Sequence, residues 1–408
     1  MKKYNSIGKE EILAANKVLK SGVLSEFIAK PGDYFLGGRN VKKFEKMVCK
    51  IFKVKYAISV NSWTSGLTAA IGAIGIEPGD EIICSPWTMS ASAISILHWN
   101  AIPVFVDIDP VTFNLDLKKL KSKISKKTRA IMAVDIFGQS EAIDEIKEII
   151  KNKNIKIISD AAQSPYAFYK KKFAGTLGDI GGYSLNYHKH INTGEGGIIV
   201  TNNKILASRA RLIRNHAESS ISKFSSINDL SNMIGYNFRL GEIEAAIGIE
   251  QLKKLKKIVL YRQKLAKILT SGLSDLQGLK VPYVRPNCSH VYYVYPLVLE
   301  KTLKIKRDKI IKLLVKEGVV GLMKGYINLY ELPIFKKKIA YGKKGFPWRL
   351  FKSKVNYSKK NYPNTEELHK KRFFGILLCS YDYKEKDVNL IVQKFKRVWS
   401  KLGLNVQK

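Results

Sequence analysis

Apolar and polar positions along the chain form short β-branched runs that alternate with amphipathic stretches from about residue 41 onward. Strands and helices that alternate in this way favour βαβ units and a largely parallel sheet covered on both faces. We therefore predict an α/β fold. The runs that we interpret as strands are YAISV (56–60), EIICSP (81–86), IPVFVDI (102–108), RAIMAVDIF (129–137), IKIISDAA (155–162), IGGYSLN (180–186) and GGIIVTN (196–202).

The same pattern divides the chain into three parts. Residues 1–40 form an N-terminal arm, with one helix from about Lys9 to Lys20 followed by a glycine-rich loop. Residues 41–255 form the large domain that carries the alternating strands and helices. Residues 256–408 form a smaller α+β domain, joined to the large one by a long helix.

Length and cysteine use limit the classes of protein that fit. The chain of 408 residues is long enough for two domains and a substantial core. No apolar run reaches the eighteen or so residues of a membrane span, and the N-terminus lacks the apolar segment of a secretion signal. The four cysteines, Cys49, Cys84, Cys288 and Cys379, are scattered without a C-x-x-C pair. We expect no disulfide framework, no metal site, no membrane insertion and a cytoplasmic location.

The formal net charge of +37 is the most unusual number of the composition. The excess is mostly lysine and is spread over the whole chain, which favours a solvated lysine-rich surface that helps to attract anionic substrates. Nucleic-acid binding is the alternative, but the sequence has no zinc finger, RNP sequence or clear recognition helix. We therefore expect no nucleic-acid partner.

Polar side chains follow several of the predicted strands, where ligands bind in parallel sheets. The stretch NSWTSG, residues 61–66, comes after the first strand and opens a helix. Backbone amides at a helix start, with the hydroxyls of Ser62, Thr64 and Ser65, form a site for a phosphate group. The alternative is that these hydroxyls simply cap the helix.

Three further strand ends carry candidate functional groups. Trp87, Thr88 and Met89 follow the second strand and offer flat or polarisable side chains that can cover an aromatic ring, with core packing as the alternative. Asp160 ends an apolar strand, where an unpaired carboxylate is costly, so it needs a cationic or hydrogen-bonding partner or caps the next segment. Lys189 follows the next strand, between two histidines in a stretch otherwise free of lysine.

Together these groups meet the needs of pyridoxal phosphate. Its aldehyde requires an amine for a Schiff base, which Lys189 supplies. Its ring nitrogen must stay protonated to draw electrons from a carbanion, and Asp160 supplies the carboxylate. The remaining candidates are phosphate donors at Trp63, Thr64 and Ser184, and a ring cover at Met89 or Trp87.

Ordered blocks of the sequence resemble the sugar aminotransferase family named for its DegT, DnrJ, EryC and StrS members. The likeness covers most of the chain, and the resemblance implies the type I, aspartate-aminotransferase-like pyridoxal phosphate fold. In that fold a large domain with a mostly parallel sheet, flanked by helices, is joined to a smaller C-terminal α+β domain. The blocks include KYAISVNSWTSGL, PGDEIICSPWTMSASA, SDAAQSPYA, YSLNYHKHINTGEGG and GYNFRLGEIEAAIGIEQL.

The resemblance also implies roles for individual residues. Lys189 forms the Schiff base, Asp160 pairs with the pyridine nitrogen, and Gln163 bonds the O3′ hydroxyl side of the ring. Asn237, in the block GYNFR, reaches the phosphate of the partner subunit, so that two active sites form at the interface of a homodimer. Arg239 lies nearby in the same block.

The sequence departs from the family pattern near two of these sites. Family members usually carry Ser-Gly-Thr where this chain has Ser-Trp-Thr, so we expect Trp63 to put an indole near the phosphate or the substrate. The ring cover is commonly aromatic where Met89 stands. His188 and His190 flank the lysine, and we expect them to point differently from Lys189, behind the cofactor contacts or at the surface.

The implied reaction is a transamination of a keto group on a nucleotide-linked sugar, with glutamate as the expected amino donor, in amino-sugar or surface polysaccharide biosynthesis. Two alternatives remain open. One is a pyridoxal phosphate-dependent dehydratase or lyase of the same fold, of which some replace the Schiff-base lysine with histidine; the other is a non-catalytic regulator. Candidate substrate contacts are Arg39, Trp87, Arg239, Lys324, Tyr326 and Tyr341.

Overall fold

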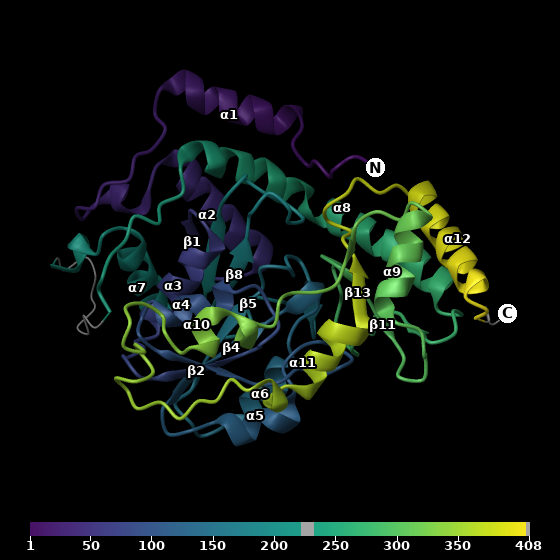
Figure 1. Cartoon of the computed structure of the whole chain (residues 1–408). Coiled ribbons are helices and arrows are strands. Elements are labelled where there is room, and N and C mark those ends of the chain that lie inside the picture. Colours follow the sequence, from purple (N-terminus) through teal and green to yellow (C-terminus); the bar gives the residue numbers. More distant parts are fainter. Residues whose placement is uncertain (222–231, 405–408) are drawn as a thin grey trace.

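A seven-stranded sheet forms the centre of the computed structural model, which describes residues 1–221 and 232–404 (Figure 1). In spatial order its strands are β1 (Tyr56–Val60), β9 (Gly197–Thr201), β8 (Ile180–Ser184), β5 (Lys156–Asp160), β4 (Thr128–Val134), β2 (Glu81–Cys84) and β3 (Ile102–Phe105). Strand β9 runs antiparallel to both of its neighbours, and the pairs from β8 to β3 are parallel. The predicted α/β class is confirmed, with one antiparallel strand inserted.

Helices cover both faces of this sheet. They are α2 (Arg39–Phe52), α3 (Trp63–Ala73), α4 (Ala91–Leu97), α5 (Leu117–Lys123), α6 (Ile143–Ile149), α7 (Lys204–Arg214) and α8 (Glu242–Leu273). Helix α1 (Lys9–Ser21) packs against α8. Side chains of α3, α4 and α7 pack on one face, whereas those of α2, α5, α6 and the first part of α8 pack on the other.

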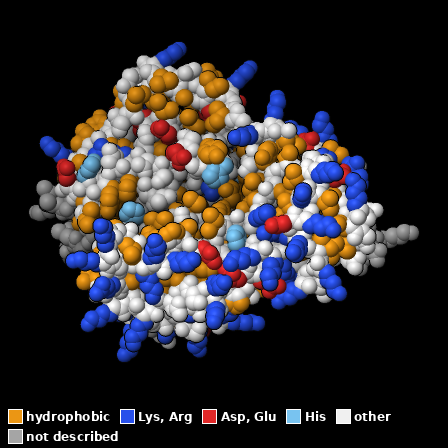
Figure 2. All heavy atoms as spheres, viewed as in Figure 1, with side chains coloured by type: hydrophobic (Ala, Val, Ile, Leu, Met, Phe, Trp, Pro, Cys, Tyr) orange, Lys and Arg blue, Asp and Glu red, His pale blue; other side chains and the backbone are white. Residues whose placement is uncertain are grey.

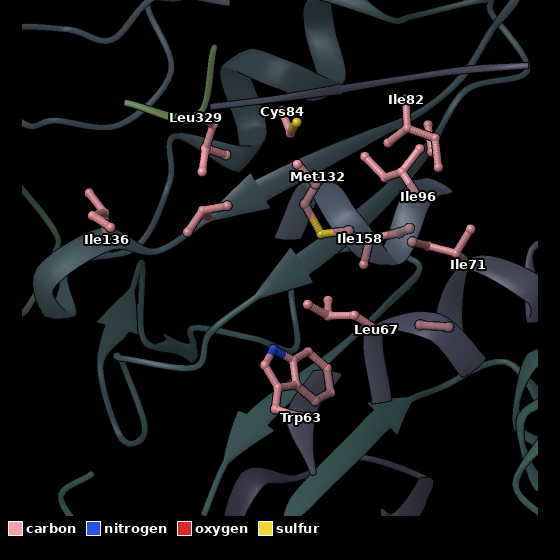
Figure 3. Packing of buried hydrophobic residues seen from close by; sticks show 14 of the residues in the cluster. Trp63, Leu67, Ile71, Ile82, Cys84, Ile96, Met132, Ile136, Ile158 and Leu329 are labelled. Atoms are coloured by element: carbon pink, nitrogen blue, oxygen red, sulfur yellow. The ribbon is translucent and has the colours of Figure 1, made fainter. Parts of the chain in front are cut away.

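The sequence of the strands explains this division into layers. Successive side chains of a strand point to opposite faces, so a strand buried on both sides is apolar throughout. Ile158 packs in the cluster with α3 and α4, which Figure 3 shows from close by, while its neighbour Ile157 packs with α5 and α6. The carboxyl ends of β4, β5 and β8 therefore meet at one edge, between two covered faces.

A smaller antiparallel sheet lies beside the first. It is covered by the last part of α8 together with α9 (Arg307–Lys316) and α12 (Glu385–Lys401), seen at the right of Figure 1. The strands, in spatial order, are β10 (Leu279–Lys280), β11 (Tyr295–Leu299), β13 (Phe373–Ile376) and β12 (Leu322–Met323). Short elements elsewhere are β6 (Phe168–Tyr169), β7 (Lys172–Phe173), α10 (Pro333–Lys336) and α11 (Pro363–Glu367).

The stretch between β12 and β13 returns to the large sheet. Leu329, Phe335, Trp348 and Tyr357 belong to the same apolar cluster as α3 and α4. Part of the region 256–408 therefore contributes to the large core, and the boundary near residue 255 stays a prediction.

Lysine and arginine side chains are distributed widely over the face seen in Figure 2, among hydrophobic and acidic ones. No helix within the described residues has both the length and the apolar composition needed to cross a bilayer.

Candidate active site

A cavity of ≈ 250 Å³ lies at the carboxyl ends of β4, β5 and β8, beside the start of α3. This is the position at which open α/β sheets bind their ligands. Its walls contain eight of the residues predicted from the sequence, which are Trp63, Thr64, Met89, Asp160, Gln163, Ser184, Lys189 and Tyr326.

Lys189 lies in the turn that follows β8, with 7% of its surface exposed. Its backbone amide donates to the carbonyl of Asn186, and its side-chain nitrogen lies over the ring of Tyr293. Burial lowers the pKa of the amine to about 8, although the negative charge of Asp160 acts in the opposite direction. A buried amine with a lowered pKa is a better nucleophile near neutral pH than a surface lysine.

Asp160 ends β5 and is 4% exposed. One carboxylate oxygen accepts hydrogen bonds from the indole nitrogen of Trp63 at 2.7 Å and from the amide of Ala162 at 3.2 Å. The other accepts from the hydroxyl of Ser92 at 2.7 Å. These three donors fix the orientation of a carboxylate that lies away from bulk water.

The position of the Trp63 side chain corrects the expectation from the sequence. Its indole does not stand over the phosphate site but turns inward, is 5% exposed, and packs beside Leu67 in the core cluster (Figure 3). The reason is that glycines at positions 66 and 182 leave room for the ring, since a Cβ at either would overlap it. Only the backbone of Trp63 is left to face a phosphate.

The start of α3 presents backbone amides that have no acceptor among the described residues. Ser62 caps the helix through its hydroxyl, which accepts from the amide of Ser65 at 3.1 Å. The amides of Trp63 and Thr64 precede the first hydrogen bond of the helix, from Gly66 to the carbonyl of Ser62. Such amides suit a phosphate group, so capping and phosphate binding are compatible here.

Gln163 and Tyr326 form one wall of the cavity. The amide oxygen of Gln163 accepts from the backbone of Phe137 at 2.8 Å, and its amide nitrogen donates to the hydroxyl of Tyr326 at 2.9 Å. Met89 lies at the mouth with 56% of its surface exposed. The contacts of these three side chains with the cofactor or the substrate stay predictions.

Trp87 does not line the cavity, which corrects its assignment as a ring cover or substrate contact. Its side chain is fully buried, and its ring packs edge-on against Phe113, Phe137 and Phe373. Its indole nitrogen donates to the backbone carbonyl of Tyr326 at 2.7 Å. Trp87 therefore fixes the segment that carries Tyr326.

The two histidines beside the lysine differ in their surroundings. His188 lines the cavity and is half-buried, and burial lowers its pKa to about 4. His190 is fully buried, with Nε2 donating to the carbonyl of Val291 at 2.8 Å and a pKa lowered to about 3 by burial. Both rings are therefore neutral near neutral pH, and only His190 lies behind the site as expected.

Five further predicted contacts lie outside the cavity wall. Arg39 borders a separate groove between α1, α2 and α8. Lys324 pairs with Asp308 at 3.0 Å, and the hydroxyl of Tyr341 donates to Asn100. The Nε atom of Arg239 donates to Asn215 at 2.9 Å, and Asn237 is exposed. Within one chain, none of these five side chains lines the cavity.

Sequence reasoning missed Ser92, Tyr293 and the position of His188. Ser92 lies in PWTMSASA, three residues after Met89 and at the start of α4. A serine at this position is the signal in the sequence for a second hydrogen-bond donor near the cavity. Tyr293 lies in an aromatic run just before β11, and nothing local links it to the lysine.

These groups fit pyridoxal phosphate, because a buried amine, a triply hydrogen-bonded carboxylate and free helix-start amides all face one cavity. The fold and the site together define a pyridoxal phosphate-dependent aminotransferase of type I. Residues 6–348 match the DegT/DnrJ/EryC1/StrS aminotransferase family, and the chain belongs to this family.

Characterised relatives support this membership. The chain is 38% identical over 277 residues to the GDP-perosamine synthase of Caulobacter vibrioides, covering 67% of this chain and 73% of the relative. It is 33% identical over 347 residues to the spore coat polysaccharide biosynthesis protein SpsC of Bacillus subtilis, covering 84% and 86%. A UDP-4-amino-4,6-dideoxy-N-acetyl-beta-L-altrosamine transaminase of Campylobacter jejuni is 31% identical, covering 83% and 86%.

Solved structures share the fold over almost the whole chain. The aminotransferase of Psychrobacter cryohalolentis superposes with a TM-score of 0.83 at 24% identity, covering 98% of this chain and 99% of that one. The GDP-4-keto-6-deoxy-D-mannose-3-dehydratase of E. coli, solved with bound hydrated pyridoxal phosphate, has a TM-score of 0.80 at 25% identity, covering 96% and 98%.

Proposed function

We propose that this chain transfers the amino group of glutamate to the keto group of a nucleotide-linked deoxysugar, in the biosynthesis of an amino sugar for a surface glycan. The observation that carries the proposal is the buried amine of Lys189 in one cavity with Asp160. The names of the GDP- and UDP-sugar relatives support the class of substrate.

Lys189 has two roles in this proposal, cofactor binding and proton transfer. Pyridoxal phosphate, when bound, would supply an electron sink beside the amino donor. Lys189 would hold the cofactor covalently and would move the proton at the donor's α-carbon. Its pKa of about 8 leaves a useful fraction of the amine neutral near neutral pH.

Other groups orient the cofactor ring and attract the anionic substrate. Asp160 would pair with the ring nitrogen, and the amides at the start of α3, with Ser184, would hold the phosphate, since all of these residues line the cavity. The excess of lysine gives a positive field that raises the encounter rate with a nucleoside diphosphate sugar.

A homodimer with shared active sites is part of this proposal. The N-terminal arm exposes several large apolar side chains, and such clusters mark association surfaces. Asn237 is exposed and free to approach a partner. The exposed side chains of the arm are Ile12, Leu13, Leu19, Val23, Leu24 and Ile28.

The test is to mix the purified holoenzyme with glutamate and follow the cofactor spectrum, then add a panel of keto-sugar nucleotides. We expect glutamate alone to convert the cofactor to its amine form, and one keto sugar to restore the original spectrum while gaining an amino group. Failure of both steps with every donor and sugar would contradict the proposal.

A dehydratase is the second candidate, and the similarity to the E. coli GDP-4-keto-6-deoxy-D-mannose-3-dehydratase favours it. The product separates the two, because mass spectrometry distinguishes an aminated sugar from a sugar that has lost water. A regulator would give neither product. A cytoplasmic location remains a prediction, and the four cysteines are free thiols.

A further inference from the structure

Trp63 is unusual because its backbone and its side chain both contribute to the cavity. Its backbone opens α3, while its indole nitrogen lies 2.7 Å from a carboxylate oxygen of Asp160. Both partners are almost completely buried. A hydrogen bond between a neutral donor and a buried charge is strong and directional.

The slot that holds the indole is formed by two separate elements. Gly66 on α3 and Gly182 on β8 both face the ring, and a Cβ on either would overlap the six-membered part of the indole. A ring held in this slot has little freedom to turn, so its N–H stays directed at Asp160. The contact therefore depends on a tryptophan at position 63 and on glycines at positions 66 and 182.

Among the described residues, the donors to Asp160 leave room for one more partner. A carboxylate has about four lone-pair sites, and Trp63, Ala162 and Ser92 fill three of them. The remaining site is on the oxygen that accepts from Ser92. A ring N–H arriving from the cavity is the group that fits it.

We infer that Trp63 is a positioning residue that holds the carboxylate of Asp160 in place and directs it at the cofactor's ring nitrogen. The physical reason is competition for one proton. Each donor to the carboxylate makes it a weaker base, so the shared proton stays on the ring nitrogen, where it increases electron withdrawal. Without the indole N–H, Asp160 takes a larger share of that proton.

The experiment compares Trp63→Phe with wild-type holoenzyme that carries a cofactor labelled with ¹⁵N in its ring. Phenylalanine keeps an aromatic ring in the slot but removes the N–H. We expect the ¹⁵N chemical shift to move from that of a protonated pyridine toward that of a neutral one. The glutamate half-reaction should slow about 10- to 100-fold, as expected for losing a hydrogen bond to a charged group.

Trp99→Phe is the matched control. Trp99 is also 5% exposed and lies in the same core cluster, and its indole nitrogen donates to the carbonyl of Thr68 at 2.7 Å. Its replacement should cost similar stability and leave the ¹⁵N signal unchanged. An unchanged signal in Trp63→Phe, or an equal change in the control, would overturn the inference.

A second variant keeps the test decisive if Trp63→Phe does not fold. Ser92→Ala removes the donor to the other oxygen, and it should move the ¹⁵N signal in the same direction. A signal that stays at the wild-type position in Ser92→Ala would contradict the competition for the proton. The ¹⁵N readout needs only bound cofactor, so it remains valid even if the sugar substrate of the proposed function is wrong.

Discussion

The side-chain nitrogen of Lys189 lies 4.3 Å from the centroid of the Tyr293 ring, over the face of the phenol. This face attracts a cation but offers it no hydrogen bond of the kind that water gives. Burial outweighs the attraction, so the pKa of the amine falls to about 8. Tyr293 lies just before β11 of the smaller sheet, and Lys189 lies in the turn after β8, so their contact joins these two segments at the cavity.

Lys189→Ala should abolish the covalently bound form of the cofactor and all turnover, because Lys189 is the residue that supplies an amine to the cavity wall among the described residues. Absorbance spectroscopy of the purified variant, with borohydride reduction and mass spectrometry, measures the loss. Lys170→Ala is the control, since Lys170 is exposed and pairs with Asp144. Undiminished transamination in Lys189→Ala would refute the assignment.

The amine of Lys189 should become reactive at a lower pH than a surface lysine. Labelling of cofactor-free protein with acetic anhydride, read by mass spectrometry, should rise with a midpoint near about pH 8 at this site. At Lys170, whose pKa is raised chiefly by its hydrogen bond to Asp144, it should rise only above pH 10.5.

Asp160→Asn should lower the midpoint for Lys189 further. Burial is the main cause of the low pKa, and the negative charge of Asp160 partly counteracts it. Without that charge, burial lowers the pKa of Lys189 further. A midpoint that rises in this variant would contradict the assigned direction.

The buried ion pair between Arg214 and Glu45 should be important for stability. The two side chains are 2.7 Å apart, and that of Arg214 is fully buried. Arg214→Ala leaves the carboxylate without its cation and should lower the free energy of unfolding by about 3–5 kcal/mol. Lys253→Ala, which breaks the exposed pair with Glu250, should cost less than about 1 kcal/mol in the same urea titration.

Glu141 should make the protein less stable as the pH rises. Its side chain is buried, and burial raises its pKa from 4.5 to about 8. Because the unfolded chain releases this proton first, the contribution of Glu141 to stability is full below about pH 4.5 and is lost as the pH rises to about 8.

Glu141→Gln should remove this part of the pH dependence. Urea titrations at pH 5 and pH 8.5 should give a smaller difference in unfolding free energy for the variant than for wild type. Glu148→Gln, at an exposed position, is the control and should keep the wild-type difference. An identical pH dependence in all three proteins would show that Glu141 is not the titrating group.

The sequence was sufficient to predict the groups that lie at strand ends. Asp160 ends one strand and Lys189 follows the neighbouring parallel strand, so the topology alone brings them to one edge. The direction of the Trp63 side chain was not predictable, because the slot at Gly66 and Gly182 comes from two elements far apart in the chain. For the same reason, the sequence does not indicate that Ser92 contacts Asp160.

Loop residues were the least predictable. Lys324 and Tyr341 lie in segments without periodic apolar positions, so nothing in their sequence fixes their direction. Trp87 was ambiguous because an aromatic residue after a strand suits both a core and a ligand. Its burial depends on Phe373, nearly 290 residues later in the chain.

The return of the segment between β12 and β13 to the large core has a mechanical consequence. The smaller sheet is tied to the larger one through α8, through this segment and through the bond from Trp87 to the backbone of Tyr326. A free hinge between the two sheets would have to break all three connections. We expect access for a bulky substrate to arise instead from rotation of rim side chains such as Met89, with the two halves staying in register throughout the catalytic cycle.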